Sequence, residues 1–538
     1  MNQLYYGDNL NVLRDHIATE SVALIYLDPP FNSQRDYNLL FKSPKGKQSE
    51  AQVEAFKDSW HWGQQAESEL AALLKQKNTD VALLMNALVA FIGRNDMMAY
   101  LVMMTSRLLE MHRVLKSTGS LYLHCDPTAS HYLRVVLDAV FGKDKFLSEV
   151  IWKRTNTHSS ANRWGPVHDV ILFLSKGEGK HCWNRPFVPL DEEDKKRRYS
   201  HADDQGRVYT HGELTAPGIR RGKSGEVWRG FDVTSLGRHW FTTVDRLDEL
   251  AAAGKIHFPE GGGWPRLIRY AEDSLGRAIG DVWVDIPPIG MSANERLGYP
   301  TQKPLALLER IIEASSDSGD VVLDPFCGCG TAVHAAQKLK RNWIGIDITH
   351  LAVSLIEKRL KDAFGAKCKF DVHGTPKDLD AARDLARRDK YQFQYWAVSL
   401  VDAQPFQGKK KGADTGIDGL KFFGDLEGPA RKIIVNVKGG ENVGPAMVKD
   451  LIATIARDKA DIGLFITLTE PTKAMTTEAA AAGFYESSNG RKFPRIQILT
   501  IEDLLSGKAR AEHPDYAPDV NFKKAQKEKT GDQKTLAL

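Results

Sequence analysis

The sequence contains few cysteines, and their spacing fits neither a disulfide framework nor a zinc site. There are five in 538 residues, namely Cys125, Cys182, Cys327, Cys329 and Cys368. A disulfide-stabilised secreted scaffold is much denser in cysteine, and a structural zinc site needs paired C-x-x-C ligands. Both classes are therefore excluded, and we expect no metal site built on cysteine.

Long apolar runs and a strong net charge are also missing. No run of about 18 apolar residues occurs, and no basic segment followed by an apolar run opens the chain. The formal net charge is only +4, so any binding of nucleic acid must come from local basic patches. We expect a cytoplasmic protein of roughly three to four structural units.

A glycine-rich turn between a predicted strand and a predicted helix is the most informative stretch that is present. Residues 321–323 are apolar, Asp324 and Pro325 end the run, and Thr331 opens a helical pattern that ends near Lys338. Two glycines in between, at positions 328 and 330, allow a turn without Cβ atoms. This order is typical of a nucleoside-binding half-sheet.

The residues around this turn argue against a phosphate ligand. Gly330 is followed by Thr331 and Ala332, whereas a Walker loop needs lysine there and a dinucleotide site needs a third glycine. The next apolar run ends in Asp347, where a carboxylate can accept hydrogen bonds from a ribose diol. We therefore expect a nucleoside ligand whose phosphates, if any, are not bound by this turn.

A second motif lies near the start of the chain, where a predicted strand, Val22–Leu27, ends in Asp28, Pro29, Pro30 and Phe31. Two prolines fix an extended, rigid backbone. The Asp28 carboxylate and the Pro29 carbonyl can each accept a hydrogen bond from an exocyclic amine, which exposes its lone pair, and Phe31 can stack on the base. The alternative is that the prolines merely end a strand.

Together these motifs resemble those of the DNA amino-methyltransferases in their circularly permuted order, with the catalytic tetrapeptide before the cofactor loop. The resemblance covers approximately residues 1–362. It is carried by GDNLNVLR at 7–14, LDPPFNS at 27–33, GSLYLHCDPTASHYLRVVLDAVFG at 119–142, IWKR at 151–154, ERLGYPTQKPLALLERIIEASS at 295–316 and DPFCGCGT at 324–331.

The resemblance implies S-adenosylmethionine (SAM) as cofactor and the N6 amine of a flipped adenine in duplex DNA as substrate. It makes Asp28, Pro29, Pro30 and Phe31 the catalytic residues. It assigns the cofactor site to Asp8, Lys303, Asp324, Phe326, Gly328, Gly330, Thr331 and Asp347. Lys303 precedes a proline and is also compatible with a plain helix start.

Three alternative functions stay open at this stage. Enzymes of this family that methylate the cytosine N4 amine more often have serine in place of Asp28, so cytosine is the second candidate substrate. The chain could also be a bifunctional methyltransferase and nuclease, or a DNA-binding protein without activity. A place in a restriction-modification or epigenetic system follows from the resemblance.

The expected fold is α/β, with a Rossmann-like SAM-dependent methyltransferase sheet that has helices on both faces. A catalytic half covers residues 1–175 and a cofactor-binding half covers 286–362. Residues 46–118 are helix-prone and are expected to cap the sheet. His124, Cys125 and Asp126 resemble a catalytic cluster, but a strand end within the sheet accounts for them and is the preferred interpretation.

Residues 176–285 interrupt the pattern of strands and are predicted to be a target-recognition domain. Basic groups neutralise phosphates, and aromatic rings can stack on or wedge between bases. A charged run is also compatible with an ordinary solvated face. The candidate DNA contacts are Lys195, Lys196, Arg197, Arg198, Arg220 and Arg221, with the aromatic residues Trp228, Phe231, Trp240, Phe241, Trp264 and Tyr270.

The chain after residue 362 resembles Mrr-type restriction endonucleases. We expect a linker helix at 363–390, an α/β nuclease-like domain at 391–505 and a flexible tail at 506–538. Asp418 and Lys438 match the nuclease pattern. Asn436 stands where the family has Glu or Gln, and Gln394 stands where its first helix often has Glu, and a neutral amide binds Mg²⁺ weakly. The domain is either a degenerate DNA- or partner-binding remnant or an active nuclease. Expected partners are double-stranded DNA, a second copy and a restriction subunit.

Overall fold

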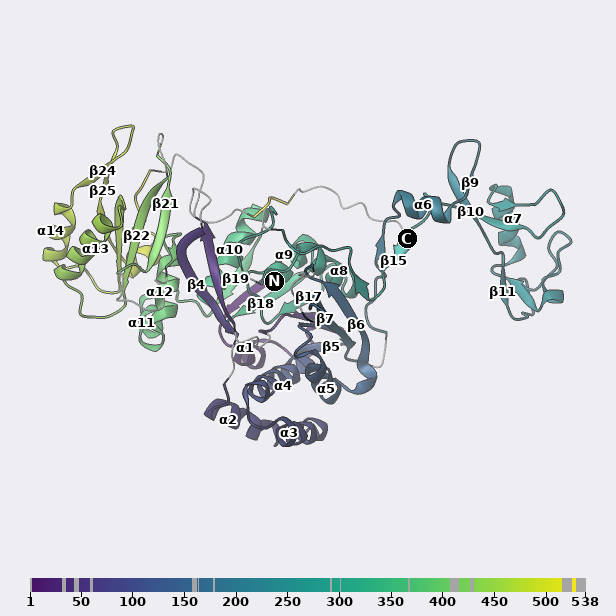
Figure 1. Cartoon of the computed structure of the whole chain (residues 1–538), viewed down its shortest axis with the longest axis horizontal. Helices are drawn as coiled ribbons and strands as arrows, with labels where there is room; N and C mark the ends of the chain where they lie inside the picture. Colours follow the sequence, from purple (N-terminus) through teal and green to yellow (C-terminus); the bar gives the residue numbers. More distant parts are fainter. Residues whose placement is uncertain are drawn as a thin grey trace. The chain divides into compact units, whose positions relative to one another are not determined.

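The computed structural model describes residues 2–30, 61–156, 162, 164–177, 180–290, 293–299, 301–365, 368–406, 416–425, 430–514 and 525–528, and the backbone alone at 35–42 and 48–58. Phe31 lies outside these residues, so its predicted role stays a prediction. The chain divides into two compact units, Met1–Asn184 with Asp281–Leu538, and Arg185–Gly280 (Figure 1). Each unit is described by itself.

A nine-stranded sheet organises the first unit. All neighbouring strands are parallel except β7, which is antiparallel to both β5 and β6. The strand order is β16 (Val282–Trp283), β6 (Phe146–Lys153), β7 (His168–Ser175), β5 (Leu115–Cys125), β2 (Val22–Leu27), β17 (Val321–Asp324), β18 (Asn342–Asp347), β1 (Asn2–Tyr6) and β19 (Phe370–His373). This confirms the predicted α/β fold.

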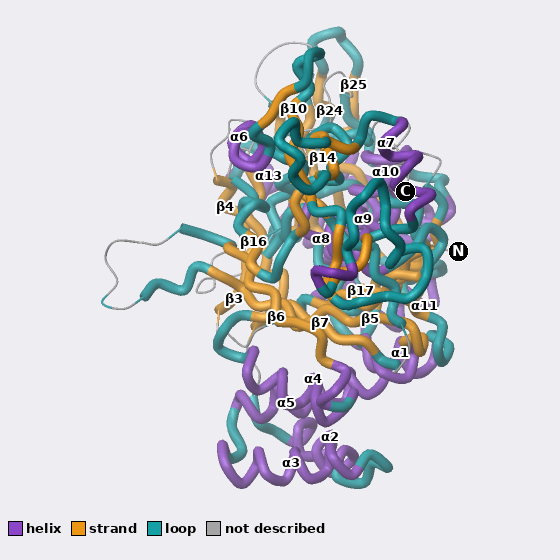
Figure 2. The backbone as a smooth tube through the Cα atoms, turned by 90° about the vertical axis from the view of Figure 1, so that its right-hand side faces the viewer, coloured by secondary structure: helices purple, strands orange, loops and turns teal. Residues whose placement is uncertain are grey.

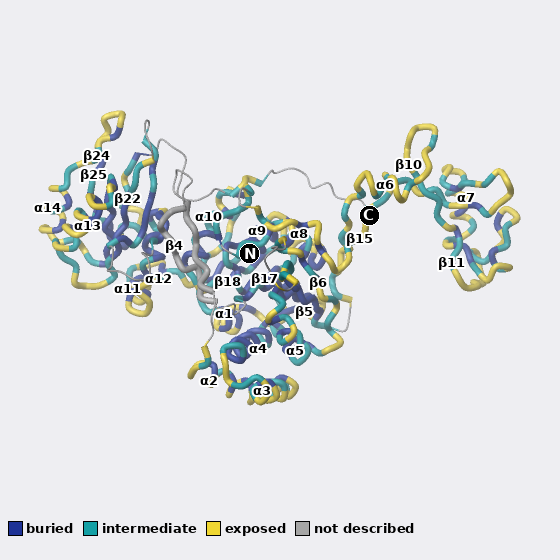
Figure 3. The backbone as a smooth tube through the Cα atoms, viewed as in Figure 1, coloured by how far each residue is buried: buried dark blue, intermediate teal, exposed yellow. Residues whose placement is uncertain are grey.

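Helices cover both faces of this sheet, with α4 and α5 on one side and α8 and α9 on the other (Figure 2). The helices of this part are α1 (Asn9–His16), α2 (Gln64–Leu73), α3 (Thr79–Ile92), α4 (Asp96–Val114), α5 (Ser130–Phe141), α8 (Leu305–Ser315), α9 (Thr331–Lys338) and α10 (His350–Phe364). Figure 3 shows the central strands as buried and the outer turns of α3 as exposed.

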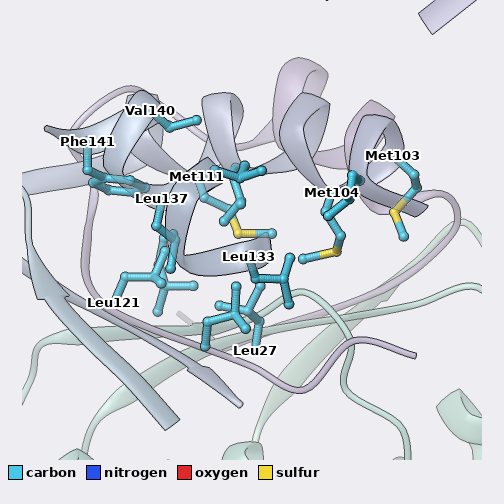
Figure 4. Packing of buried hydrophobic residues seen from close by; sticks show 14 of the residues in the cluster. Leu27, Met103, Met104, Met111, Leu121, Leu133, Leu137, Val140 and Phe141 are labelled. Carbon is cyan, nitrogen blue, oxygen red and sulfur yellow. The ribbon is translucent and has the colours of Figure 1, made fainter. Parts of the chain in front are cut away.

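The main core lies between the sheet and helices α4 and α5. In α5 the buried residues recur every three to four positions, which places Leu133, Leu137 and Phe141 on one face. They pack with Met111 of α4 and Leu121 of β5 (Figure 4). Each such side chain contributes about 1.5–3 kcal/mol when fully buried, and the core fixes the sheet whose edge carries the site.

Two predictions about this part were wrong. Residues 48–58, expected to be helical, form strand β4 (Gln48–Asp58), which pairs with β3 (Arg35–Lys42). The predicted linker helix at 363–390 was wrong in its first part, where β19 pairs with β1 and extends the sheet, whereas α11 (Leu379–Arg388) is helical as expected. Strand pairing overrides local helix propensity in both places, with the preceding strand β3 in the first and with the distant β1 in the second.

The nuclease-like part contains a five-stranded sheet in the order β20 (Gln404–Pro405), β21 (Gly419–Phe423), β22 (Arg431–Lys438), β23 (Ile462–Thr467) and β26 (Ile496–Thr500). Its helices are α11 (Leu379–Arg388), α12 (Lys390–Ser399), α13 (Pro445–Arg457), α14 (Lys473–Ala481) and α15 (Ile501–Ser506), and β24 (Phe484–Glu486) pairs with β25 (Lys492–Pro494). One hydrophobic cluster joins Leu351 and Leu355 of α10 to Tyr395 and Ile417.

The second unit is built around tryptophans. Trp228 and Trp240 are 3% and 0% exposed and form its core with Leu247, packed against the partly buried Phe231 and Trp264. Burial of Trp228 and Trp240 argues against the prediction that they contact DNA, because a unit this small uses its large rings to fill its own core. The predicted DNA contacts of Phe231 and Trp264 stay predictions.

The second unit contains β8 (Phe187–Val188), α6 (Glu192–Arg198), β9 (His201–Ala202), β10 (Val208–Gly212), β11 (Thr215–Pro217), β12 (Arg238–Trp240), α7 (Val244–Ala252), β13 (Ile256–His257), β14 (Arg266–Tyr270) and β15 (Arg277–Ala278). Strands β13, β14, β10 and β9 form a four-stranded sheet.

Most of the predicted tail at 506–538 lies outside the described residues. The described parts are held to the first unit: Glu512 donates its backbone N–H to Gln497 Oε1 at 2.8 Å, and the Glu528 side chain accepts from His334 at 3.0 Å. Among the described residues, no helix is both long and apolar enough to cross a membrane.

Candidate active site

Three carboxylates end three adjacent parallel strands. Asp28 follows β2, Asp324 ends β17 and Asp347 ends β18, and the pairing of these strands brings their carboxyl ends to one edge of the sheet. Burial raises the pKa of the Asp324 carboxyl well above its ordinary value, and the charges of Asp28 and Asp347 raise it further. Such a cluster favours a cationic ligand over a phosphate.

The Asp28 side chain has one engaged oxygen and one open oxygen. Lys303 Nζ donates to Oδ2 at 2.5 Å. The other oxygen, Oδ1, is buried and has no hydrogen-bond partner among the described residues. A buried carboxylate oxygen without a donor is costly, so this atom is available to accept a hydrogen bond from a ligand. The resemblance assigns Lys303 to the cofactor, and the structure brings it to Asp28.

The predicted glycine turn contains two residues in the left-handed region. Gly330 has φ +74° and precedes α9, and a Cβ there would lie 2.7 Å from Ile356 Cγ1. Gly328 has φ +53°, and a Cβ there would lie 3.3 Å from the buried ring of Tyr299. Both positions therefore require glycine for the backbone conformation, and Gly330 also for lack of space.

Asp347, at the end of the neighbouring strand β18, holds this turn by hydrogen bonds. Its Oδ2 accepts from Gly328 N at 2.8 Å, and its Oδ1 accepts from the Thr349 backbone at 2.9 Å. Burial raises the pKa of this carboxyl. Oδ1 also accepts from the Thr349 hydroxyl at 2.9 Å, so it is Oδ2 that keeps a second lone pair for a ribose hydroxyl, and the predicted ribose contact stays a prediction.

Asp8 and its neighbours form a buried polar group at the end of β1. Asp8 caps α1, accepting from Leu10 N at 2.9 Å, and pairs with Arg107 Nη2 at 2.7 Å. Asn9 accepts from the same arginine at 2.6 Å and donates to Pro325 O at 2.8 Å. Asp8 thus supports the cofactor turn, and its predicted contact with adenine is untested. The only sequence signal for Arg107 is a charged residue within a mostly apolar segment.

Phe326 and Thr331 lie in the turn but contact the protein. Phe326 packs against the main core, and Thr331 Oγ1 accepts from Arg359 Nη1 at 3.1 Å. Arg359, on α10, also donates to the Cys329 carbonyl at 3.0 Å. The sequence does not predict this role for Arg359, because nothing in a charged amphipathic helix distinguishes an inward arginine. The buried thiols of Cys327 and Cys329 have raised pKa values because of burial.

The candidate DNA contacts fall into two groups. On α6, Lys195 pairs with Glu192 at 2.6 Å and Arg197 pairs with Asp194 at 2.8 Å, so half of this basic run is neutralised, whereas Lys196 and Arg198 are exposed. Arg220 and Arg221 are exposed in a loop and form no ion pair within the described residues. The positive charges of Arg220 and Arg221 are therefore less neutralised by neighbouring carboxylates than those of α6.

The nuclease-like pattern does not assemble a cation site. Asp418 Oδ1 accepts from Gln394 Nε2 at 3.0 Å, and its Oδ2 accepts from Val437 N at 2.7 Å. Asn436 donates to Gly416 O at 3.0 Å. N–H donors thus point at both oxygens that a magnesium ion would need, and no group of three or more His, Cys, Asp or Glu side chains in the described residues is arranged to hold a metal. Lys438 ends β22 beside this group.

Comparison with known proteins identifies two families along the chain. The family described as DNA methylase matches residues 22–358, and the family described as restriction endonuclease matches residues 385–505. The first match covers more than half of the chain and includes both Asp28 and the glycine turn.

Individual relatives agree with this. The chain is 35% identical over 298 residues to Type II methyltransferase M.EcaI of Enterobacter cloacae, covering 55% of this chain and 65% of the relative. It is 26% identical over 359 residues to the Mod subunit of the Type III restriction-modification enzyme StyLTI of Salmonella typhimurium, covering 63% and 50%. It is 46% identical over 81 residues to DNA adenine methyltransferase YhdJ of Escherichia coli, covering 15% and 27%.

The chain thus spans only half to two thirds of the length of the first two relatives. The family match itself extends over the whole nine-stranded sheet except its β1 and β19 edge. On this match, the chain belongs to the DNA methylase family.

Proposed function

We propose that this protein transfers a methyl group from SAM to the exocyclic N6 amine of an adenine flipped out of duplex DNA. The observation that carries the proposal is the buried, unpartnered Oδ1 of Asp28, which follows a strand adjacent to the glycine turn. An oxygen in this position can accept a hydrogen bond from an amine beside a cofactor on that turn.

The carboxylate cluster supports SAM as the cofactor. SAM supplies an electrophilic methyl group on a positively charged sulfonium, and it also carries an ammonium group. Asp324 and Asp347 would attract these positive charges, and the nucleoside would lie beside the turn that contains Gly328 and Gly330. Asp347 would hold the ribose, and Asp8 would lie toward the adenine of the cofactor.

Asp28 would activate the target amine. The lone pair of an exocyclic amine is delocalised into the base, so the amine is a poor nucleophile. A hydrogen bond from the amine to Asp28 Oδ1 would draw the nitrogen toward tetrahedral geometry. Lys303 holds the other oxygen and fixes the direction of the carboxylate. No covalent enzyme intermediate is required.

Adenine is preferred over cytosine as the target. The tetrapeptide has Asp28 where cytosine-N4 enzymes of the family more often have serine, and one relative is named a DNA adenine methyltransferase. Cytosine N4 is the second candidate.

We infer that residues 185–280 recognise the target sequence in double-stranded DNA, with Arg220 and Arg221 on phosphates. The likeness to a Mod subunit supports a separate restriction subunit as partner and a place in a restriction-modification system. A homodimer and a cytoplasmic location complete the proposal.

We infer that the nuclease-like domain does not cut DNA. Its one carboxylate of the expected set, Asp418, is occupied by N–H donors, and the neighbouring positions are the amides Gln394 and Asn436. A DNA- or partner-binding role fits this chemistry better than metal-dependent hydrolysis.

The test is to express the full chain in a host whose DNA is unmethylated and to sequence its genomic DNA with a modification-sensitive method. We expect N6-methyladenine at one recurrent motif, absent with Asp28→Ala. Methyl groups on cytosine N4 instead would identify the second candidate, and no modified base would reject the proposal. Purified chain incubated with unmethylated DNA and Mg²⁺ should leave the DNA uncut.

A further inference from the structure

A network of buried polar side chains connects three neighbouring strands next to Asp28. Tyr26 of β2 is 2% exposed, and its hydroxyl lies 2.9 Å from Nδ1 of His124 on β5. His124 is fully buried, and its Nε2 lies 3.1 Å from Oδ2 of Asp169 on β7. Asp169 is 2% exposed, and Arg154 Nη1 lies 3.2 Å from its other oxygen.

The carboxylate at one end determines the direction of these hydrogen bonds. Burial by itself would raise the pKa of Asp169, but the hydrogen bond from His124 and the positive charges of Lys303 and Arg154 lower it. An ionised Asp169 accepts a hydrogen bond from Nε2–H of His124, and in this tautomer Nδ1 accepts the hydrogen bond from the Tyr26 hydroxyl. Each member is thus held in one orientation.

This network is connected to Asp28 in two ways. Tyr26 is two residues before Asp28, the charge of Asp28 acts on the Tyr26 hydroxyl, and the rigid Pro29–Pro30 segment follows directly. The positive charge of Lys303 acts on Asp169 as well as pairing with Asp28. A shift of Tyr26 would therefore move the Asp28 carboxylate.

We propose that Tyr26, His124 and Asp169 are positioning residues that hold the Asp28 carboxylate at the place where it accepts the hydrogen bond of the target amine. This inference rests on the proposed methyl transfer at Asp28. Among the described residues, the hydrogen bonds and ion pairs of Tyr26 and Asp169 go to His124 and Arg154 and not to the glycine turn, so we expect their loss to change the chemical step more than cofactor binding. His124, whose position looked catalytic in the sequence, acts through Tyr26.

The test is Tyr26→Phe, which removes a single oxygen. A misplacement of about 1 Å can cost about a hundredfold in rate, so we expect kcat for methyl transfer to fall by about ten- to a hundredfold. The SAM dissociation constant, measured by calorimetry, should stay within about twofold of wild type.

Tyr122→Phe is the matched control. Tyr122 pairs with Tyr26 across β2 and β5, is 3% exposed and also makes one hydroxyl hydrogen bond, at 2.7 Å to Ser315 Oγ. It lies outside the Asp169 network, so its loss should lower stability similarly but leave kcat near the wild-type value.

His124 provides a second pair of variants. His124→Asn can place its amide oxygen at the position of Nδ1 and accept from Tyr26, whereas His124→Leu cannot. We expect His124→Asn to retain more turnover than His124→Leu. If Tyr26→Phe and Tyr122→Phe lower kcat equally, or if Tyr26→Phe acts only by weakening SAM binding, the positioning role is rejected while the proposed function stands. If the wild-type chain transfers no methyl group, the proposed function and the positioning role are both rejected.

Discussion

At the scale of the residue, the site is governed by buried charge. Asp28, Asp324 and Asp347 meet at adjacent strand ends, and Lys303 is the cation paired with one of them. A buried carboxylate cluster is costly in the free protein, and a cationic ligand would relieve that cost. The cost of a buried charge also applies to His350, a buried histidine beside the site, and makes the stability of the protein depend on pH.

His350, the first residue of α10, is 1% exposed, and its ring stacks on Tyr6 with centroids 3.6 Å apart. Burial, reinforced by the charge of Arg388, lowers its pKa to about 3, whereas an unfolded histidine has a pKa of about 6.5. Between these pH values the unfolded chain binds the extra proton, so the free energy of unfolding falls as pH drops.

At pH 5 this linkage should remove about 2 kcal/mol of stability relative to neutral pH. His350→Phe keeps a ring against Tyr6 and removes the titration, so its Tm should change less than that of wild type between pH 7 and pH 5. The exposed His131, replaced by Phe, is the control. Parallel pH dependences of His350→Phe and wild type would contradict the assignment.

At the scale of the element, the cofactor turn depends on helix α10, which follows α9 and β18 in the chain. Arg359 is 4% exposed and donates from α10 to the Cys329 carbonyl, the Thr331 hydroxyl and His334 Nδ1, the last at 3.2 Å. A buried guanidinium with these partners fixes the spacing between the turn and α10.

Arg359→Met keeps most of the volume and removes the three donors. We expect the SAM dissociation constant to rise by about tenfold, or roughly 1.4 kcal/mol, because the turn loses its fixed shape. Lys361→Met on the same helix is the control, since Lys361 is 66% exposed and pairs only with Glu357 among the described residues. Equal SAM affinity in both variants would show that the cofactor turn keeps its conformation without Arg359.

At the scale of the whole molecule, the methyltransferase part and the nuclease-like part of the first unit share one hydrophobic cluster. Leu351 and Leu355 of α10 share it with Tyr395 and Ile417 of the nuclease-like part, and Tyr299 beside Gly328 belongs to it as well. The nuclease-like domain therefore packs against the elements that form the cofactor turn. The second unit has a core of its own around Trp228 and Trp240.

DNA binding by the second unit should depend on salt through its uncompensated arginines. Replacing Arg220 and Arg221 by Ala should make the plot of log K against log salt concentration less steep by about one unit for each phosphate that is no longer neutralised. Lys195→Ala and Arg197→Ala should change the slope less, because Glu192 and Asp194 already neutralise these residues. Fluorescence anisotropy with labelled duplex DNA measures the slope, and an unchanged slope would place the DNA elsewhere.

The sequence alone determined the local features of this protein. Apolar runs and turn residues were sufficient to predict β2, β17 and α9 with nearly their observed bounds, and the motifs around Asp28 and Gly330 predicted the family. These features depend on neighbouring residues, through strand and helix periodicity and through the backbone freedom of glycine and proline.

Only the tertiary structure decided which side chains meet. The pairing of Lys303 with Asp28, 275 positions apart, and the contacts of Arg107 and Arg359 follow from strand order and helix packing, which no local pattern encodes. The burial of Trp228 and Trp240 was also decided by the tertiary structure, whereas their aromatic side chains near basic residues suggested DNA contact. Burial depends on the whole chain, because a side chain becomes core only when distant segments cover it.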